Sequence, residues 1–195
     1  MIGLVIGSSG KTNKEITNTL IPSVFSIGVN RAAIDFNVDI ATTSESAPIR
    51  EWLQFGTSAK KFLINEKYSF LVPSSIKYTP FDEITFDFDT THRLFYGHRN
   101  SALPAIHYLI IQGCKTILLS GITFEPNWDY YHLDVAKHHE QSHCDQIRQS
   151  LYELSEFATL ISINQNSFNP KFVQTVTSED ILMNIVSSES NVNRI

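Results

Sequence analysis

The chain has 195 residues, a formal net charge of −5 and 42% hydrophobic residues, which suits one domain with a buried core. This acidic balance argues against nucleic-acid binding, which usually shows a basic stripe, and no apolar run reaches the roughly 18 residues of a membrane span. Two cysteines make no disulfide framework, and the N-terminus lacks the basic start of a signal peptide. We therefore expect a cytoplasmic protein with reduced thiols.

The first half of the chain is predicted to alternate short buried strands with short helices. Strands are expected at 2–6, 24–29, 38–41, 62–64 and 70–72. Helices are expected at 14–20 and 51–55, with a helical or turn segment at 30–36.

In the second half, an alternating segment at 85–89 predicts an edge strand or hairpin. A helix should begin near Asn100 or Ser101 and end at Gly113, followed by a strand at 116–119. A long helix at 137–157, a strand at 160–163 and a helix at 179–186 complete the pattern, and residues 188–195 should form a frayed tail. The alternation predicts an α/β fold: one domain over 1–187 with a mostly parallel, doubly wound sheet flanked by helices.

The segment KTILLSGITFEPNWDYYH, residues 115–132, is the most informative for function. Its apolar run ends at Ser120 and Gly121 and is followed by a loop rich in Trp, Tyr, Asp and His. In open α/β sheets the ligand site lies just beyond the carboxyl ends of the strands. The loop from Thr123 to His132 is therefore a candidate site, and an ordinary surface loop is the alternative.

A glycine-rich turn, Gly7-Ser8-Ser9-Gly10, follows the first predicted strand. Although Gly10-Lys11-Thr12 copies the end of the phosphate-loop motif, Val5 stands where that motif needs its first glycine. The dinucleotide fingerprint G-x-G-x-x-G also fails. Backbone N–H groups of such a turn can still bind a phosphate or ribose, and the alternative is a tight turn without a ligand.

Metal-binding patterns are weak. Asp87 and Asp89 have D-x-D spacing but lie in the strand-like stretch, where an exposed edge is the simpler interpretation. His139 and His143 would share a helix face, but neither HExxH nor paired CxxC supports zinc. We predict no metal site. Arg31 is a candidate phosphate ligand, with a surface salt bridge as the alternative.

Three segments together resemble a known superfamily: LVIGSSG, SIGVNRAAIDFNVDIATTSE and SALPAIHYLIIQGCKTILLSGITF. They are similar to the Rossmann-like proteins that include the sialyltransferases of glycosyltransferase family 42 and the 6-hydroxymethylpterin diphosphokinase-like proteins. The resemblance covers the chain from about Gly3 to His143, and more loosely to Asn166. It implies a single Rossmann-like, nucleotide-binding domain.

The resemblance also implies roles for individual residues. The turn of Gly7, Ser8, Ser9 and Gly10 would line the nucleotide phosphate and ribose, and Asn30 would contact the nucleotide or its sugar. The base and ribose would be held at the end of the central strand by Ser120, Gly121 and Thr123. The family usually has Asp at the position of Thr123, and Pro-Ser-Leu where this chain has Lys11-Thr12-Asn13.

Catalytic roles follow from the same resemblance. Tyr130 and Tyr131 would donate hydrogen bonds to the departing phosphate. A histidine would remove the acceptor proton, with His138, His139 and His143 as candidates and the last two preferred. An imidazole suits this role at neutral pH, and phenols stabilise a leaving phosphate without a metal.

The resulting functional prediction is a metal-independent, sialyltransferase-like glycosyltransferase that uses a CMP-sugar donor, a glycan or small-molecule acceptor and no cofactor. One alternative is an ATP-dependent diphosphokinase whose Mg²⁺ would be bound by carboxylates among Asp35, Asp39, Glu45 and Asp129. The other is a nucleotide-binding protein without catalysis. Neither nucleic acid nor a membrane is an expected partner, and a homo-oligomer remains open.

Overall fold

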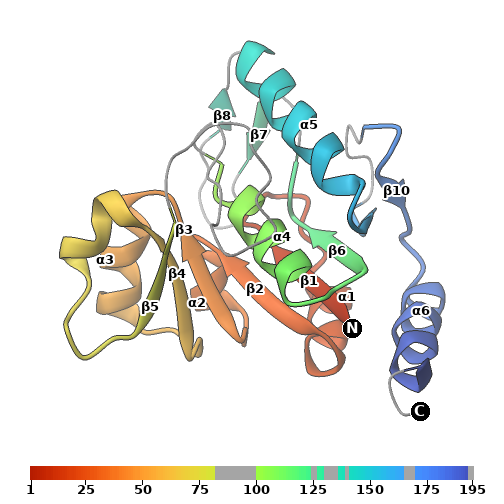
Figure 1. The fold of residues 1–195 in the computed structure, drawn as a ribbon, viewed down its shortest axis with the longest axis horizontal. Helices are drawn as coiled ribbons and strands as arrows, with labels where there is room; N and C mark the ends of the chain where they lie inside the picture. Colours follow the sequence, from red (N-terminus) through yellow and green to blue (C-terminus); the bar gives the residue numbers. More distant parts are fainter. Residues whose placement is uncertain (82–99, 124–126, 130–135, 139–140, 165–169, 193–195) are drawn as a thin grey trace.

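The computed structural model describes residues 1–81, 100–123, 127–129, 136–138, 141–164 and 170–192. They form an eight-stranded parallel sheet with helices on both faces, so the predicted α/β fold is confirmed (Figure 1). The sheet order is β10-β9-β6-β1-β2-β3-β4-β5. Its strands are β1 (Ile2–Ile6), β2 (Phe25–Val29), β3 (Ile40–Thr43), β4 (Lys61–Asn65), β5 (Tyr78–Phe81), β6 (Thr116–Ser120), β9 (Thr159–Ser162) and β10 (Gln174–Thr175).

Six α-helices and two short 3-10 helices surround the sheet in the described part of the chain. The α-helices are α1 (Lys14–Leu20), α2 (Ala32–Asp35), α3 (Ser46–Phe55), α4 (Ala102–Ile111), α5 (Gln141–Ser155) and α6 (Glu179–Val192). The 3-10 helices are η1 (Ile21–Ser23) and η2 (Glu66–Leu71). A separate antiparallel pair joins β7 (Asn127–Asp129) to β8 (Ala136–His138).

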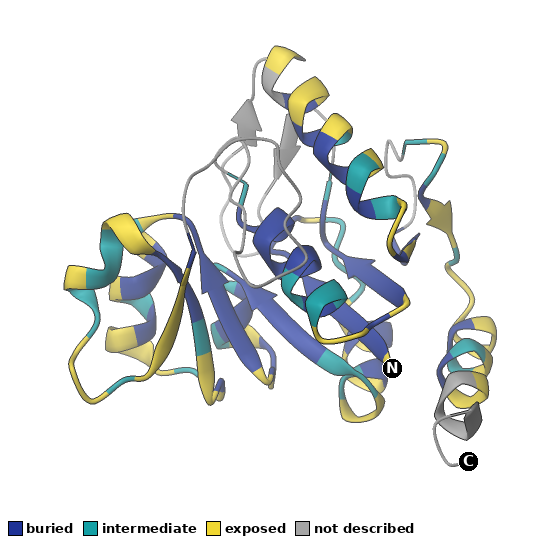
Figure 2. Cartoon of the chain, in the orientation of Figure 1, coloured by how far each residue is buried: buried dark blue, intermediate teal, exposed yellow. Residues whose placement is uncertain are grey.

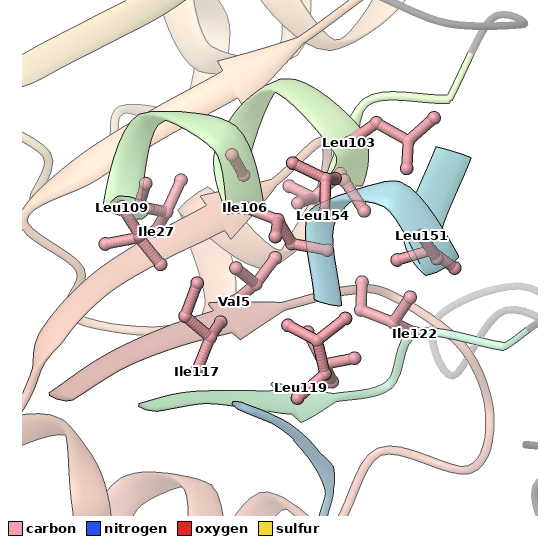
Figure 3. Packing of buried hydrophobic residues seen from close by; sticks show 14 of the residues in the cluster. Val5, Ile27, Leu103, Ile106, Leu109, Ile117, Leu119, Ile122, Leu151 and Leu154 are labelled. Carbon is pink, nitrogen blue, oxygen red and sulfur yellow. The ribbon is translucent and has the colours of Figure 1, made fainter. Parts of the chain in front are cut away.

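The central strands are buried on both faces, which explains why their sequences are continuous apolar runs (Figure 2). Successive side chains point to opposite faces. Val5 and Leu119 pack with Ile106 of α4 and Leu151 of α5 on one face (Figure 3). The opposite face packs against α1, α2, α3 and α6, through residues such as Trp52.

The strand order creates a switch point between β1 and β6. From β1 the chain adds β2 to β5 successively on one side, whereas β6 pairs with the other side of β1. In doubly wound sheets, ligands bind beyond the carboxyl ends of the strands at such a point. The segments that follow β6, β1 and their neighbours are therefore where a ligand site is expected in this fold.

Several predicted elements need correction. Residues 70–72 are not a strand: η2 runs to Leu71, and Phe70 is 78% exposed, so this apolar triplet is not a core segment. The helix predicted from 137 begins at Gln141, because Ala136–His138 pairs as β8. Helix α6 continues to Val192 and so includes part of the segment predicted to fray from 188; the fraying itself stays a prediction.

Strands β5 and β10 were not predicted, and the strand at 85–89 falls outside the described residues. β5 carries Pro80, which is tolerated because this strand lies at the sheet edge. β10 has two exposed polar residues and therefore no apolar pattern. Across the described ranges, no helix is both long and apolar enough to span a membrane.

Candidate functional site

Four adjacent strands, β6, β1, β2 and β3, end at one edge of the sheet, which we call the carboxyl edge. The residues that follow them are Gly121–Thr123, Gly7–Thr12, Asn30 and Ser44. Neighbouring strands lie about 4.8 Å apart, so these segments span roughly 14 Å. Most of the sequence-predicted binding residues are therefore brought together here.

The turn after β1 is held by its own side chains. Thr12 Oγ1 donates to Ser9 O at 2.6 Å, and Lys11 N donates to Ser9 Oγ at 3.2 Å. Ser8 and Ser9 are buried, whereas Gly10 is exposed. Within the described residues, the N–H groups of Ser8 and Gly10 have no hydrogen-bond partner. Both can therefore donate to a ligand.

Gly7 and Gly121 allow the turns after β1 and β6 to pack against each other. Gly7 N donates to Ser120 O at 2.7 Å, and Gly121 has φ 63°. A Cβ on Gly121 would overlap Thr12 Oγ1 and lie 2.7 Å from Gly7 O. Both glycines were predicted to line the nucleotide, but here the close approach that they permit is between two protein segments.

Ser120 was predicted to hold the base and ribose, yet its hydroxyl is engaged elsewhere. Ser120 Oγ is hydrogen-bonded to Thr17 Oγ1 of α1 at 2.6 Å, and both side chains are fully buried. The Ser120 hydroxyl thus fixes α1 against β6. Thr123 follows the same strand and is half-buried.

Asn30 is the most unusual residue of the carboxyl edge. Its φ of 55° is in the left-handed region, which Asn tolerates better than other side chains. Its N–H donates to Thr42 O at 2.9 Å, and its carbonyl accepts from Trp52 Nε1 at 2.9 Å. The backbone is thereby fixed in this conformation.

The side chain of Asn30 contrasts with its backbone. Asn30 Oδ1 is buried and has no hydrogen-bond partner in the described structure, and the same is true of Thr42 Oγ1 on the neighbouring strand. Buried polar atoms are normally hydrogen-bonded, so an unpartnered pair needs an explanation. A ligand that donates to the amide oxygen would supply one.

Two serines that the sequence analysis did not select join α4 to the end of β3. Ser101 Oγ accepts from Ser44 N at 2.9 Å and lies 2.6 Å from Ser44 Oγ. Asn100 Oδ1 accepts from Ala102 N, at the first residue of α4, at 2.9 Å. The N-terminus of α4, which carries a partial positive charge, is thereby placed near the carboxyl edge.

Asn164 was also missed. It follows β9 and is fully buried, and its Oδ1 accepts from Gly121 N at 2.7 Å while its Nδ2 donates to Ile122 O at 3.3 Å. This amide therefore fixes the turn after β6. Its signal in the sequence was a polar residue at the end of the apolar run 160–163; Asn30 also follows a strand, but it was selected through the family resemblance.

Arg31 does not join these residues. Its guanidinium lies 3.4 Å from the Asp35 carboxylate, 3.8 Å from that of Glu51 and 5.4 Å from the ring centre of Phe55. These partners belong to α2 and α3. The geometry thus matches the salt-bridge alternative for Arg31.

The carboxylates proposed for Mg²⁺ are not gathered. Asp39 precedes β3, at the opposite edge of the sheet, and its Oδ2 accepts from Ser26 N at 2.8 Å and from Ser26 Oγ at 2.9 Å. Asp35 pairs with Arg31, and the side-chain placement of Asp129 in β7 is not described. Of the four proposed carboxylates, Glu45 is the one whose described position follows a strand of the carboxyl edge, and it is exposed. Among the described residues, no group of three or more His, Cys, Asp or Glu could hold a metal ion.

The predicted catalytic residues are largely beyond what the structure describes. Tyr130, Tyr131 and His139 lie outside the described residues. His138 ends β8 and His143 belongs to the first turn of α5, but the placement of their side chains is not described. The imidazole and phenol roles therefore stay predictions.

Comparisons with known proteins do not show a family for this chain. No family model matches the chain, and no curated protein sequence matches it. A solved structure of thiamine pyrophosphokinase from Bacillus subtilis is similar at 13% identity and a TM-score of 0.35, over 80% of this chain. The match spans 56% of that structure's chain. The resemblance to family 42 sialyltransferases has no support from these comparisons and remains a hypothesis.

Proposed function

We propose that the chain binds a nucleotide at the carboxyl edge and acts as a nucleotide-dependent transferase. The observation that carries this proposal is the Asn30 side chain. A strained backbone and a buried, unpartnered amide oxygen mark a position whose missing partner is a ligand. A nucleoside offers donors of this kind, as ribose hydroxyls or an exocyclic amine.

The surroundings of Asn30 suit the phosphate end of the same ligand. The Ser8 and Gly10 N–H groups on one side and the N-terminus of α4 on the other are groups that favour an anion. Apart from Lys11 in the turn after β1, the polar groups of the described residues at this edge are neutral hydroxyls and amides. Such a set binds a nucleotide mainly through hydrogen bonds.

Two transfer reactions fit this binding mode. The first is transfer of a sugar from a nucleotide donor such as a CMP-sugar, with His139 or His143 removing the acceptor proton and Tyr130 or Tyr131 stabilising the leaving phosphate. The second is diphosphate transfer from ATP to an alcohol. The exposed Glu45 beside the carboxyl edge favours this second reaction, because a carboxylate there can bind Mg²⁺.

The binding proposal is tested by Asn30→Gly. Glycine adopts the left-handed backbone without strain, so the substitution removes only the amide. We expect the affinity for CMP or ATP, measured by calorimetry, to fall roughly tenfold, as for one lost hydrogen bond. Asn37→Gly, an exposed position after α2, is the control and should bind as the unchanged protein does. Equal affinity in both variants would exclude Asn30 from the site.

A donor panel separates the reactions. Turnover of a CMP-sugar that persists in EDTA supports glycosyl transfer, whereas ATP consumption that requires Mg²⁺ and an alcohol acceptor supports the diphosphokinase. Nucleotide binding without turnover of any donor would leave the non-catalytic alternative.

A further inference from the structure

A cavity lies away from the carboxyl edge, between α3, β4 and the segment after η2. Its volume is about 220 Å³. It is lined by Ile49, Trp52, Leu53, Thr57, Phe62, Ile64, Val72, Pro73 and Ile76. No residue of the proposed nucleotide site belongs to this lining. We call it the α3 pocket.

The lining of the α3 pocket defines what can occupy it. Two of the lining side chains carry polar groups, and both groups already make hydrogen bonds within the protein. Trp52 Nε1 donates to Asn30 O, and Thr57 Oγ1 donates to Ala33 O. The remaining side chains are apolar. A charged or strongly polar group would lose its hydration without gaining a side-chain partner. The occupant must therefore be uncharged and apolar.

The volume of the α3 pocket and its opening to the surface further limit which molecules can occupy it. An apolar cavity of about 150 Å³ accommodates benzene in a known engineered case, so 220 Å³ suits one aromatic ring system or a branched aliphatic group. Leu53 is 49% exposed and Trp52 only 5%, so the pocket extends from the surface to a buried indole. The outer side of α3 faces solvent (Figure 2).

The same two hydrogen bonds connect the α3 pocket to the carboxyl edge. Trp52 donates a hydrogen bond to the carbonyl of Asn30, and Thr57 donates one to the carbonyl of Ala33. Two residues that line the α3 pocket are therefore hydrogen-bonded to the two ends of the segment 30–33. Asn30 is the residue with the strained backbone in that segment. A molecule that contacts the Trp52 indole therefore acts on a direct partner of Asn30.

We propose that the α3 pocket is a second ligand site, for a small uncharged aromatic or branched aliphatic molecule, and that its occupancy alters the environment of Asn30. This inference does not rest on the nucleotide proposal. Binding at the pocket and its effect on Asn30 are both observable without any nucleotide.

Indole, as the probe, tests the proposal in the isotopically labelled full chain by NMR. We expect saturable shifts of the Trp52 Nε1–H and Asn30 amide signals, with Trp128→Phe used to assign the indole resonance. Val72→Phe should fill the pocket and weaken indole binding at least tenfold. Ile181→Phe, at an exposed aliphatic position on α6, should leave binding unchanged.

Leu53→Glu is a second variant in case Val72→Phe fails to fold. Leu53 is half-exposed, so the fold should accept the change, and a carboxylate at the mouth of the pocket should also weaken indole binding. The site is refuted if indole gives no saturable Trp52 shift, or if neither substitution weakens binding. A Trp52 shift without an Asn30 shift refutes the connection. Concentration-dependent dimerisation that Leu53→Glu abolishes would assign the pocket to a second copy instead. None of these outcomes depends on nucleotide binding.

Discussion

At the scale of single residues, Gly121 shows how a backbone conformation and a close contact combine. Its positive φ disfavours any side chain, and a Cβ would also overlap Thr12 Oγ1 and approach Gly7 O. Gly121→Ala should therefore lower the free energy of unfolding by roughly 2–5 kcal/mol, from left-handed strain plus overpacking.

Gly113 provides the matched control for this prediction. Its φ is 87°, but a Cβ there would meet no atom of the described residues within 4 Å. Gly113→Ala should thus cost only the strain, about 1–2 kcal/mol. Urea unfolding measures both variants. Equal losses would mean that the close packing of the turns after β1 and β6 contributes nothing.

The same residues show what could be predicted from the sequence at this scale. A glycine follows each of two buried strands, and the sequence analysis placed both beside a nucleotide; in the structure both permit a close approach of backbone. The partner in that approach could not be inferred, because Gly7 and Gly121 meet only through the pairing of β1 with β6. Asn30 was selected as a binding residue, but its fixed conformation depends on Trp52, 22 positions later.

At the scale of elements, the junction of β3 with α4 depends on one hydroxyl. Ser101→Ala would leave the buried N–H of Ser44 without its acceptor, which costs about 1–3 kcal/mol. For a chain of this length we expect the Tm to fall by roughly 2–12 °C. Ser155→Ala removes an exposed hydroxyl bonded to Tyr152 O and should change stability by at most about 0.5 kcal/mol. A Tm unchanged by Ser101→Ala would show that this junction is not needed for stability.

Helix α5 carries a buried thiol that makes stability depend on pH. Burial raises the pKa of Cys144 above its usual value; Arg148 opposes this shift and Asp145 adds to it. Above the ordinary thiol pKa of about 8.5, the unfolded chain loses the proton first, so it binds fewer protons than the native state. The free energy of unfolding should therefore fall as the pH rises from 8.5 towards the raised native pKa.

Urea unfolding at pH 7.5 and 9.5 measures this effect. Burial also raises the pKa of Tyr108, which adds a fall in the same direction only above about pH 10. In Cys144→Ala the decrease between pH 7.5 and 9.5 should be smaller than in the unchanged protein. The same decrease in both proteins would assign the pH dependence to other groups.

Elements with a strong apolar pattern were predictable, and those with a weak one were not. The central strands and α4 are buried along most of their length, so their composition alone indicates them. β10 is an exposed edge strand and β5 is exposed at three of four positions, so they depend on pairing with a neighbour rather than on burial. The strand predicted at 70–72 is wrong because Phe70 is exposed, while Leu71 and Val72 pack against the core from outside the sheet.

At the scale of the whole molecule, the sheet order explains why one edge collects the candidate site. Placing β6 beside β1 brings residues from positions 7, 121 and 164 into contact. The sequence indicated that strands end in polar residues, but strand order is a tertiary property. Asn164 and the pair Ser44–Ser101 therefore emerge only once the sheet is assembled.

The central claim is that a nucleotide binds across the ends of β6, β1, β2 and β3. Amide hydrogen exchange of the full chain, with and without saturating CMP or ATP, tests it most directly. We expect slower exchange in residues 7–12, at Asn30 and Arg31, at Ser44 and in the first turn of α4. Protection confined to other regions, or no protection by either nucleotide, would contradict it.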